Sequence, residues 1–226
     1  MIIAIGGGEV RKNETYAIDK FIVEQSEKEK PTLLFIPTAS RDNPFYVDTI
    51  KRLYGDLGCE VDTLFLCSED MTVETAKGKI ENADIIYVGG GDTEFMMNKW
   101  REFQVDKFLI EAYKKDKVLS GLSAGSICWF IAGFDYEVSD AEKSLKYPKI
   151  QGLGIVPYLN CPHYDKVEPE KFDKYYLKEN TSLIALENQT ALVWDKGQLY
   201  VINSNPNKNV YELSIVDRAL KKRILE

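Results

Sequence analysis

The sequence predicts an α/β fold: a doubly wound, mostly parallel, flavodoxin-like sheet with an antiparallel extension toward the C-terminal end. Short apolar runs alternate with amphipathic segments of helical period up to about residue 118. The connections between these segments are short, as in βαβ units. After residue 180, short apolar runs follow one another directly and are separated by turn-forming residues, a pattern typical of antiparallel strands. Residues 1–226 are interpreted as one domain, because no repeat, low-complexity segment or linker interrupts them.

The first half of the chain should supply the parallel strands and their covering helices. Strands are predicted at 2–5, 32–36, 61–66, 85–88 and around 118. Helices are predicted over 14–28, 47–57, 73–80, 96–100 and 105–112. In such sheets ligands bind at the carboxyl ends of the strands, where the glycine-rich segments 89–93 and 121–126 would both lie.

The second half is less regular. Residues 134–150 are polar and are expected to form a loop or flap. A strand is expected to end at His163, and Pro169 suits the first turn of a helix over 168–178. Short strands are predicted at 183–186, 191–194 and 199–202. The basic run 221–223 is interpreted as a solvated helix end.

Composition narrows the class of function. Apolar residues make up 44% and charged residues 29% of the chain, as in ordinary soluble proteins. The net charge of −7 argues against a nucleic-acid partner. Four cysteines without CxxC spacing argue against a zinc or redox site, so neither a metal nor a cofactor is expected. No signal peptide or membrane-length apolar segment is present, which favours a cytoplasmic protein without a membrane partner; a homodimer is left open.

The most informative motif is Gly-x-Ser-x-Gly, which spans Gly121 to Gly125 with Ser123 at its centre. It stands between a predicted strand and a helix-compatible segment, the context of a nucleophile elbow. Small neighbours are needed there because the two limbs of so tight a turn nearly touch. The turn also places Ser123 at a helix N-terminus, where free N–H groups favour developing negative charge. Small-residue turns also occur without chemistry, so the motif needs partners.

The chain holds one histidine, and this restricts the mechanisms available. If an imidazole activates Ser123, it must belong to His163. Three acidic residues are candidates for the group that orients this ring. Glu187 is the leading candidate because it follows an apolar strand, while Asp165 and Asp140 are alternatives.

The chain order serine, histidine, acid differs from that of α/β-hydrolases and resembles the class I glutamine-amidotransferase-like architecture, in which the elbow normally carries cysteine. With serine there, the sequence is similar to peptidase family S51, which includes dipeptidase E and cyanophycinase. Six well-separated segments carry the resemblance in the family's order: 3–8, 36–40, 88–93, 121–126, 160–164 and 186–187.

The resemblance implies a serine peptidase in which Ser123 is the nucleophile, His163 the general base and Glu187 the orienting acid. It implies a small peptide substrate and an acyl-enzyme intermediate. A serine-type dipeptidase is therefore expected, with two alternatives: an esterase or amidase that uses the same triad, and a non-catalytic ligand-binding homologue.

Further site residues also follow from the resemblance. The oxyanion hole would use the backbone N–H of Ala124 and of Gly90 or Gly91. Asp140 is the nearest counterpart of an aspartate considered for charge relay or substrate binding. Dipeptidase E reads an N-terminal aspartate with an arginine shortly after the catalytic histidine, but only lysines stand between residues 163 and 187 here. Because lysine cannot reproduce a bidentate carboxylate clamp, a preference for Asp-X substrates is left open.

Overall fold

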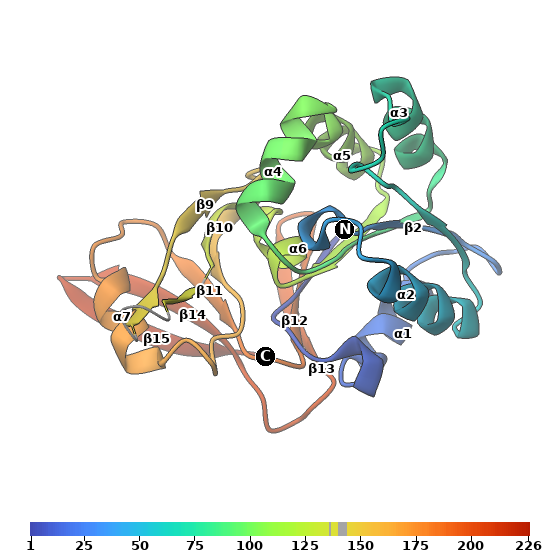
Figure 1. Ribbon diagram of the computed structural model, residues 1–226. Helices are drawn as coiled ribbons and strands as arrows, with labels where there is room; N and C mark the ends of the chain where they lie inside the picture. The colour runs from blue at the N-terminus through green and yellow to red at the C-terminus, as the bar shows by residue number, and fades with distance from the viewer. Residues whose placement is uncertain (136, 140–143) are drawn as a thin grey trace.

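The computed structural model describes residues 1–135, 137–139 and 144–226, and its strands form two main sheets (Figure 1). The first sheet has the order β13-β12-β1-β5-β4-β2-β3. Its strands are β1 (Ile2–Ile5), β2 (Thr32–Ile36), β3 (Glu60–Thr63), β4 (Ile85–Val88), β5 (Val118–Leu122), β12 (Thr190–Asp195) and β13 (Gln198–Asn203). Strands β1 to β5 run parallel to their neighbours, and β12 and β13 extend the sheet antiparallel beside β1.

Helices cover both faces of this sheet (Figure 1). One face carries α1 (Tyr16–Glu24) and α2 (Pro44–Asp56), and the other α3 (Val73–Asn82), α4 (Thr93–Glu102) and α5 (Val105–Lys114). Since side chains alternate along a strand, Ile3 packs toward α1 and α2 while Ala4 packs toward the opposite group. The central strands are therefore buried on both sides, which explains their continuous apolar sequences.

The second sheet has the order β15-β14-β11-β10-β6-β9. Its strands are β6 (Phe130–Phe134), β9 (Lys149–Gln151), β10 (Val156–Cys161), β11 (Leu183–Leu186), β14 (Val210–Val216) and β15 (Ala219–Leu225). Strands β6, β10 and β11 are parallel, whereas β9, β14 and β15 run antiparallel to their neighbours. Helix α7 (Pro169–Tyr176) packs on this sheet through Phe172 and Tyr176, and β7 (Glu137–Ser139) pairs with β8 (Ser144–Lys146).

The predicted α/β class is confirmed, but the C-terminal half differs from the expectation of one extended sheet. The chain leaves β5 through the short helix α6 (Ala124–Ile127) and begins a second sheet with β6. Strands β12 and β13 then return to the first sheet.

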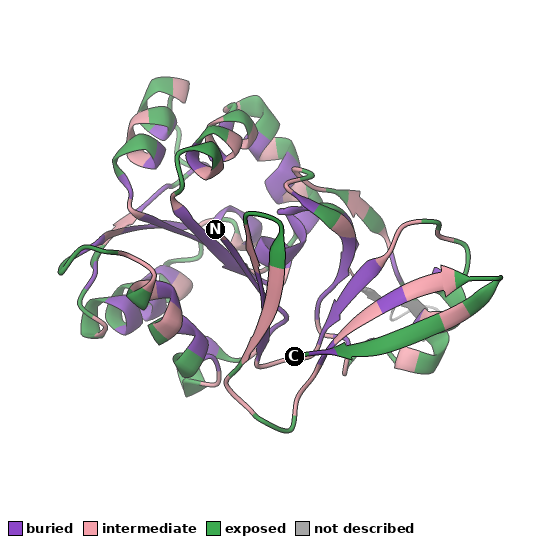
Figure 2. Cartoon of the chain, turned by 180° about the vertical axis from the view of Figure 1, so that it is seen from behind, coloured by how far each residue is buried: buried purple, intermediate pink, exposed green. Residues whose placement is uncertain are grey.

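Two local predictions were also wrong. The basic run 221–223 belongs to strand β15, the exposed edge of the second sheet, where charged side chains discourage pairing with another chain (Figure 2). Parts of the segment expected to be an irregular loop form β7, β8 and β9.

All four cysteines are free thiols. In the described ranges, no helix has both the length and the apolar character needed to cross a bilayer.

Candidate active site

The nucleophile elbow predicted from the sequence lies where β5 meets α6. Ser123 adopts φ 59° and ψ −112°, a backbone conformation that a non-glycine residue rarely occupies. The two flanking glycines are sterically required. A Cβ at Gly121 would lie 2.3 Å from the carbonyl oxygen of Gly125, and a Cβ at Gly125 would lie 2.2 Å from that of Val88. Close packing of the backbone therefore fixes the turn that carries the Ser123 side chain.

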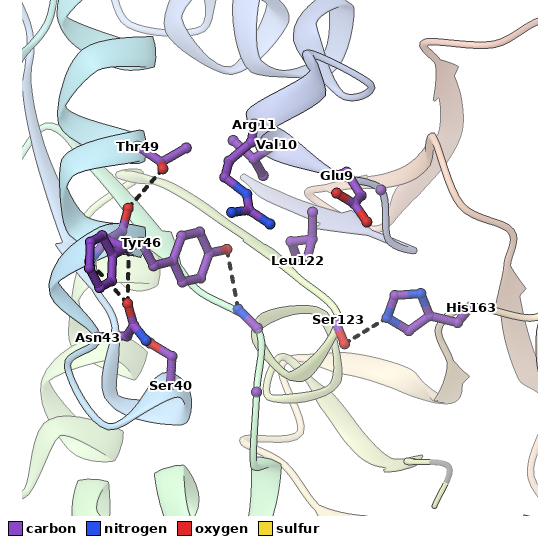
Figure 3. Close-up of a pocket in the computed structure, with 14 residues that line it drawn as sticks. Glu9, Val10, Arg11, Ser40, Asn43, Tyr46, Thr49, Leu122, Ser123 and His163 are labelled. Carbon is purple, nitrogen blue, oxygen red and sulfur yellow. Dashed lines mark hydrogen bonds between the residues drawn. The ribbon is translucent and has the colours of Figure 1, made fainter. Parts of the chain in front are cut away.

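His163 reaches this serine from the other sheet, just after the end of β10. Its Nε2 lies 2.8 Å from Ser123 Oγ (Figure 3). The backbone N–H of His163 donates to Gly6 O at 2.8 Å, which ties the histidine loop to the end of β1. A Cβ at Gly7 would lie 2.3 Å from the imidazole, so glycine is needed beneath the ring. The expected proximity of Ser123 and His163 is therefore present.

The second ring nitrogen contacts Asn188. His163 Nδ1 and Asn188 Oδ1 are 2.6 Å apart. Because the amide oxygen can only accept, Nδ1 carries the proton in this contact. Nε2 is then the unprotonated nitrogen, and it can accept the proton of the Ser123 hydroxyl. This tautomer is the one that a general base requires.

Asn188 takes the place that the sequence interpretation gave to Glu187. The Glu187 carboxylate instead accepts a hydrogen bond of 2.9 Å from the backbone N–H of Asn209. The side chains of Glu187 and Asn188 point in different directions after the end of β11, as those of consecutive residues in an extended chain do. The structure thus places an amide, rather than the expected carboxylate, at Nδ1 of His163.

A carboxylate is present one step farther from the ring. Asp165 Oδ1 accepts from the backbone N–H of Asn188 at 2.9 Å, and Asp165 Oδ2 lies 2.7 Å from Lys208 Nζ. Burial raises the pKa of Asp165, but Lys208 and the Asn188 N–H more than offset this and hold that pKa below its ordinary value. Asp165 is therefore charged at neutral pH. It fixes the backbone of Asn188, while the alternative candidate Asp140 lies outside the described residues.

Electrostatics favour the neutral form of the histidine. Burial lowers the pKa of His163 below 6.5, although the Asn188 hydrogen bond and the carboxylates of Asp135 and Asp165 act in the opposite direction. Neutral imidazole therefore predominates at pH 7, ready to accept a proton. In the described part of the chain, no group of three or more His, Cys, Asp or Glu side chains is placed to hold a metal ion.

Two of the expected oxyanion-hole residues, Ala124 and Gly90, lie beside the nucleophile. Ala124 is the first residue of α6, so its N–H belongs to the orphan donors of a helix start. Gly90 is close to the serine, since a Cβ built on it would lie 3.3 Å from Ser123 Cβ. Its N–H donates to Tyr46 Oη at 3.4 Å. Gly91 packs against Ala39, whose carbonyl oxygen would lie 2.2 Å from an added Cβ.

Two pockets share His163, Gly8 and Glu9 in their linings. The first, of about 590 Å³, contains Ser123, Gly90 and Tyr46. Of the described residues that line it, Glu9 and Arg11 carry a charge, while His163 is neutral. The second, of about 440 Å³, is more polar, and three lysines and three acids line it together with His163 and Asn188: Lys12, Lys166, Lys208, Glu9, Glu14 and Asp165.

Comparison with known proteins fixes the family. The model of peptidase family S51 matches residues 2–202. The chain belongs to peptidase family S51. It is 31% identical to the uncharacterized peptidase YgaJ of Bacillus subtilis, over 97% of this chain and 94% of the relative.

Other relatives agree with this assignment. A protein named peptidase E from Shewanella denitrificans is 29% identical, over 66% of this chain and 60% of the relative. The crystal structure of a peptidase from an acI-B1 actinobacterium superposes with a TM-score of 0.71 at 22% identity, covering 99% of this chain and 96% of that one. At that level of identity the superposition shows a shared fold. The S51 assignment makes the protein a peptidase, and hence a hydrolase.

Sequence reasoning missed three residues of this S51 peptidase site: Asn188, Tyr46 and Arg11. Asn188 is adjacent to Glu187, the leading candidate from the sequence. Because an acid is the expected orienting group, carboxylates were considered and the neighbouring amide was not. Tyr46 and Arg11 stand in segments whose apolar period or charge suits ordinary helical surfaces. Tyr46 and Arg11 line the pocket of Ser123 only because the fold brings together three segments that are far apart in the sequence.

Proposed function

We propose that this S51 peptidase is a serine peptidase that hydrolyses dipeptides or short peptides through Ser123, His163 and Asn188. The observation that carries the proposal is the contact of 2.8 Å between Ser123 Oγ and His163 Nε2 on a nucleophile elbow. The neutral imidazole next to the hydroxyl supports a role as general base. The pairing of a nucleophile, a base and a group that orients the base is the general logic of covalent catalysis.

The reaction would proceed in two halves. His163 Nε2 takes the Ser123 hydroxyl proton as Oγ forms a bond to the peptide carbonyl carbon, and the imidazolium is stabilised by its Nδ1–H donating to Asn188. The imidazolium then gives its proton to the departing amine as the C–N bond breaks, which leaves an acyl-enzyme. Water, deprotonated by the same nitrogen, attacks the ester and releases the acid. Ser123 recovers its proton, so the cycle is balanced.

The pockets support small substrates. The leaving amine must lie close to the histidine that protonates it, so the acyl residue would occupy the pocket that Gly90 borders and the leaving residue would extend toward the second pocket. Lys12 and Lys208 pair there with Glu9 and Asp165, whereas Lys166 makes no ion pair among the residues that the structure describes and suits the terminal carboxylate of a dipeptide. Arg11 makes no ion pair within the described ranges, and its guanidinium points toward Leu122 in the acyl pocket (Figure 3). An arginine in this place supports a preference for an acidic first residue.

The test compares the wild type with Ser123→Ala on the dipeptides Asp-Leu and Asn-Leu, which differ in one charge. We expect cleavage by the wild type, faster for Asp-Leu, and loss of turnover by roughly 10⁶-fold, to background, in the variant, because the nucleophile is gone. A thermal melt checks that the variant is folded. Retained cleavage by the variant would refute the assignment of the nucleophile. Ester hydrolysis without peptide cleavage would favour the esterase alternative.

A further inference from the structure

Tyr46 belongs to α2, far in the sequence from the catalytic residues, yet its hydroxyl reaches the loop that follows β4. Gly90 N–H donates to Tyr46 Oη at 3.4 Å, and Tyr46 lines the same pocket as Ser123. Figure 3 shows the phenol directed from α2 into the pocket that also contains Arg11, Leu122 and Ser123. The Tyr46 hydroxyl thus lies next to the N–H of Gly90, and Gly90 is itself a neighbour of Ser123.

The ring is held firmly in this position. It makes an edge-on contact with Phe35, with ring centroids 5.1 Å apart. On another side it packs on the backbone of Gly89, where an added Cβ would lie 2.9 Å from Tyr46 Cε1. The glycine at position 89 therefore makes room for the phenol. A donor whose position is fixed before the reaction needs no reorganisation when charge develops.

The hydroxyl also keeps its proton. A phenol has one proton to donate and two lone pairs that accept, so the bond from Gly90 N–H leaves the proton available. Burial raises the pKa of Tyr46 to about 12, against the opposing effects of the Gly90 N–H and the Tyr87 hydroxyl. The Tyr87 hydroxyl is buried close by but forms no hydrogen bond of ordinary geometry in the described part of the chain. The Tyr46 proton is thus not committed to it.

We propose that Tyr46 is a catalytic residue that donates its hydroxyl proton in a hydrogen bond to the oxyanion of the tetrahedral intermediate, beside the N–H of Ala124. The inference rests on the proposed peptidase function and adds a side-chain donor to it. The attacked carbonyl carbon must lie against Ser123 Oγ, and the adjoining backbone on that side is Gly90. A donor hydroxyl that is hydrogen-bonded to Gly90 is therefore within reach of the oxygen on which negative charge accumulates.

The experiment removes one hydroxyl at a time. Tyr46→Phe keeps the ring and its packing and should lower kcat for Asp-Leu by roughly 10²- to 10³-fold with KM little changed, as for the loss of one oxyanion donor. Tyr176→Phe removes a buried phenol hydroxyl on α7, which donates to backbone carbonyls outside the pocket of Ser123, and should leave kcat and KM unchanged. A dipeptide-like boronic acid, which forms a tetrahedral adduct with serine, should lose affinity for Tyr46→Phe far more than a non-reactive substrate analogue does. Thermal melts of both variants check folding.

The outcomes separate this inference from the proposed function. Unchanged or higher kcat in a folded Tyr46→Phe, or a change in KM alone, would overturn the donor role while leaving the peptidase assignment intact. An equal loss in Tyr176→Phe would also overturn it, because the effect would then be structural. A wild type that binds the boronic acid but cleaves no dipeptide would count against the proposed function, and the boronic acid affinities would still decide the role of Tyr46.

Discussion

Ser123 and His163 come from two sheets that hold their catalytic groups in different ways. The serine is held by backbone packing within a turn of a few residues, at glycines that no other side chain could replace. The histidine is held by a chain of hydrogen bonds through the side chain and backbone N–H of Asn188 and the side chains of Asp165 and Lys208, which come from three separate segments. The first arrangement is local in the sequence, and the second exists only in the folded protein.

The difference separates what a motif can reveal from what it cannot. A turn that tolerates only glycine leaves a readable pattern, because the steric requirement falls on consecutive residues. A chain of hydrogen bonds requires only that a donor lies opposite an acceptor. Many residue types at many positions can satisfy that requirement. Changes in the elbow should therefore damage folding and activity together, while changes around the histidine should affect activity with little loss of stability.

The largest effect is expected at Gly125. In Gly125→Ala the new methyl would lie 2.2 Å from Val88 O, so the elbow must open. We expect a loss of about 3 kcal/mol of unfolding free energy, the upper end of overpacking costs, together with loss of turnover. Chemical denaturation measures the former.

Gly78→Ala is the matched control, because Gly78 lies within α3 and an added Cβ there has no neighbour within 4 Å. It should stabilise the protein by about 0.5–1 kcal/mol through helix propensity. If Gly125→Ala were as stable as the wild type, the local, steric account of the elbow would be wrong.

The same distinction explains how much of the fold the sequence predicts. Strands buried on both faces are continuous apolar runs, so β1, β2 and β4 were predicted at their observed bounds and β5 was predicted near its observed start. The local sequence of a strand does not specify which other strands it pairs with. The apolar runs of β11 and β12 look alike in sequence, yet they belong to different sheets. Edge strand β15 was missed because its charged residues resemble a solvated helix end.

Within the site, the sequence predicted the residues that geometry or uniqueness singles out. Ser123 follows from the elbow and His163 from being the sole histidine. Glu187 and Asn188 are adjacent, and which of them faces the imidazole depends on the direction in which the chain leaves β11. No local pattern specifies that direction.

The next largest effect on kcat is expected from substitutions at Asn188 and Glu187. Asn188→Ala removes the acceptor that stabilises the imidazolium, a hydrogen bond to a charged group worth about 1.5–3 kcal/mol. If that free energy is lost from the transition state, kcat falls by roughly 10- to 150-fold. Glu187→Ala should leave kcat unchanged, since its carboxylate contacts Asn209. Steady-state kinetics of both variants on one dipeptide make the comparison, and thermal melts verify that each is folded. The reverse ranking would restore Glu187 as the orienting group.

The smallest effect is expected in the dependence of kcat/KM on pH. Only neutral His163 can take the serine proton, so activity falls as pH drops through the pKa of that residue. Because burial lowers the pKa of His163, the midpoint of this fall should lie below pH 6.5. The Asp165 carboxylate raises that pKa, so Asp165→Asn should move the midpoint to still lower pH and extend activity into more acidic solution.

A matched control for this shift is available at the far edge of the first sheet. Asp62 forms an ion pair with Lys79 at 2.6 Å, comparable to that of Asp165 with Lys208, but on β3. Asp62→Asn should therefore leave the midpoint of the pH profile unchanged. A midpoint above pH 6.5 in the wild type, or an upward shift in Asp165→Asn, would mean that burial does not control the ionisation of the histidine. The chain of contacts behind it would then act by position rather than by charge.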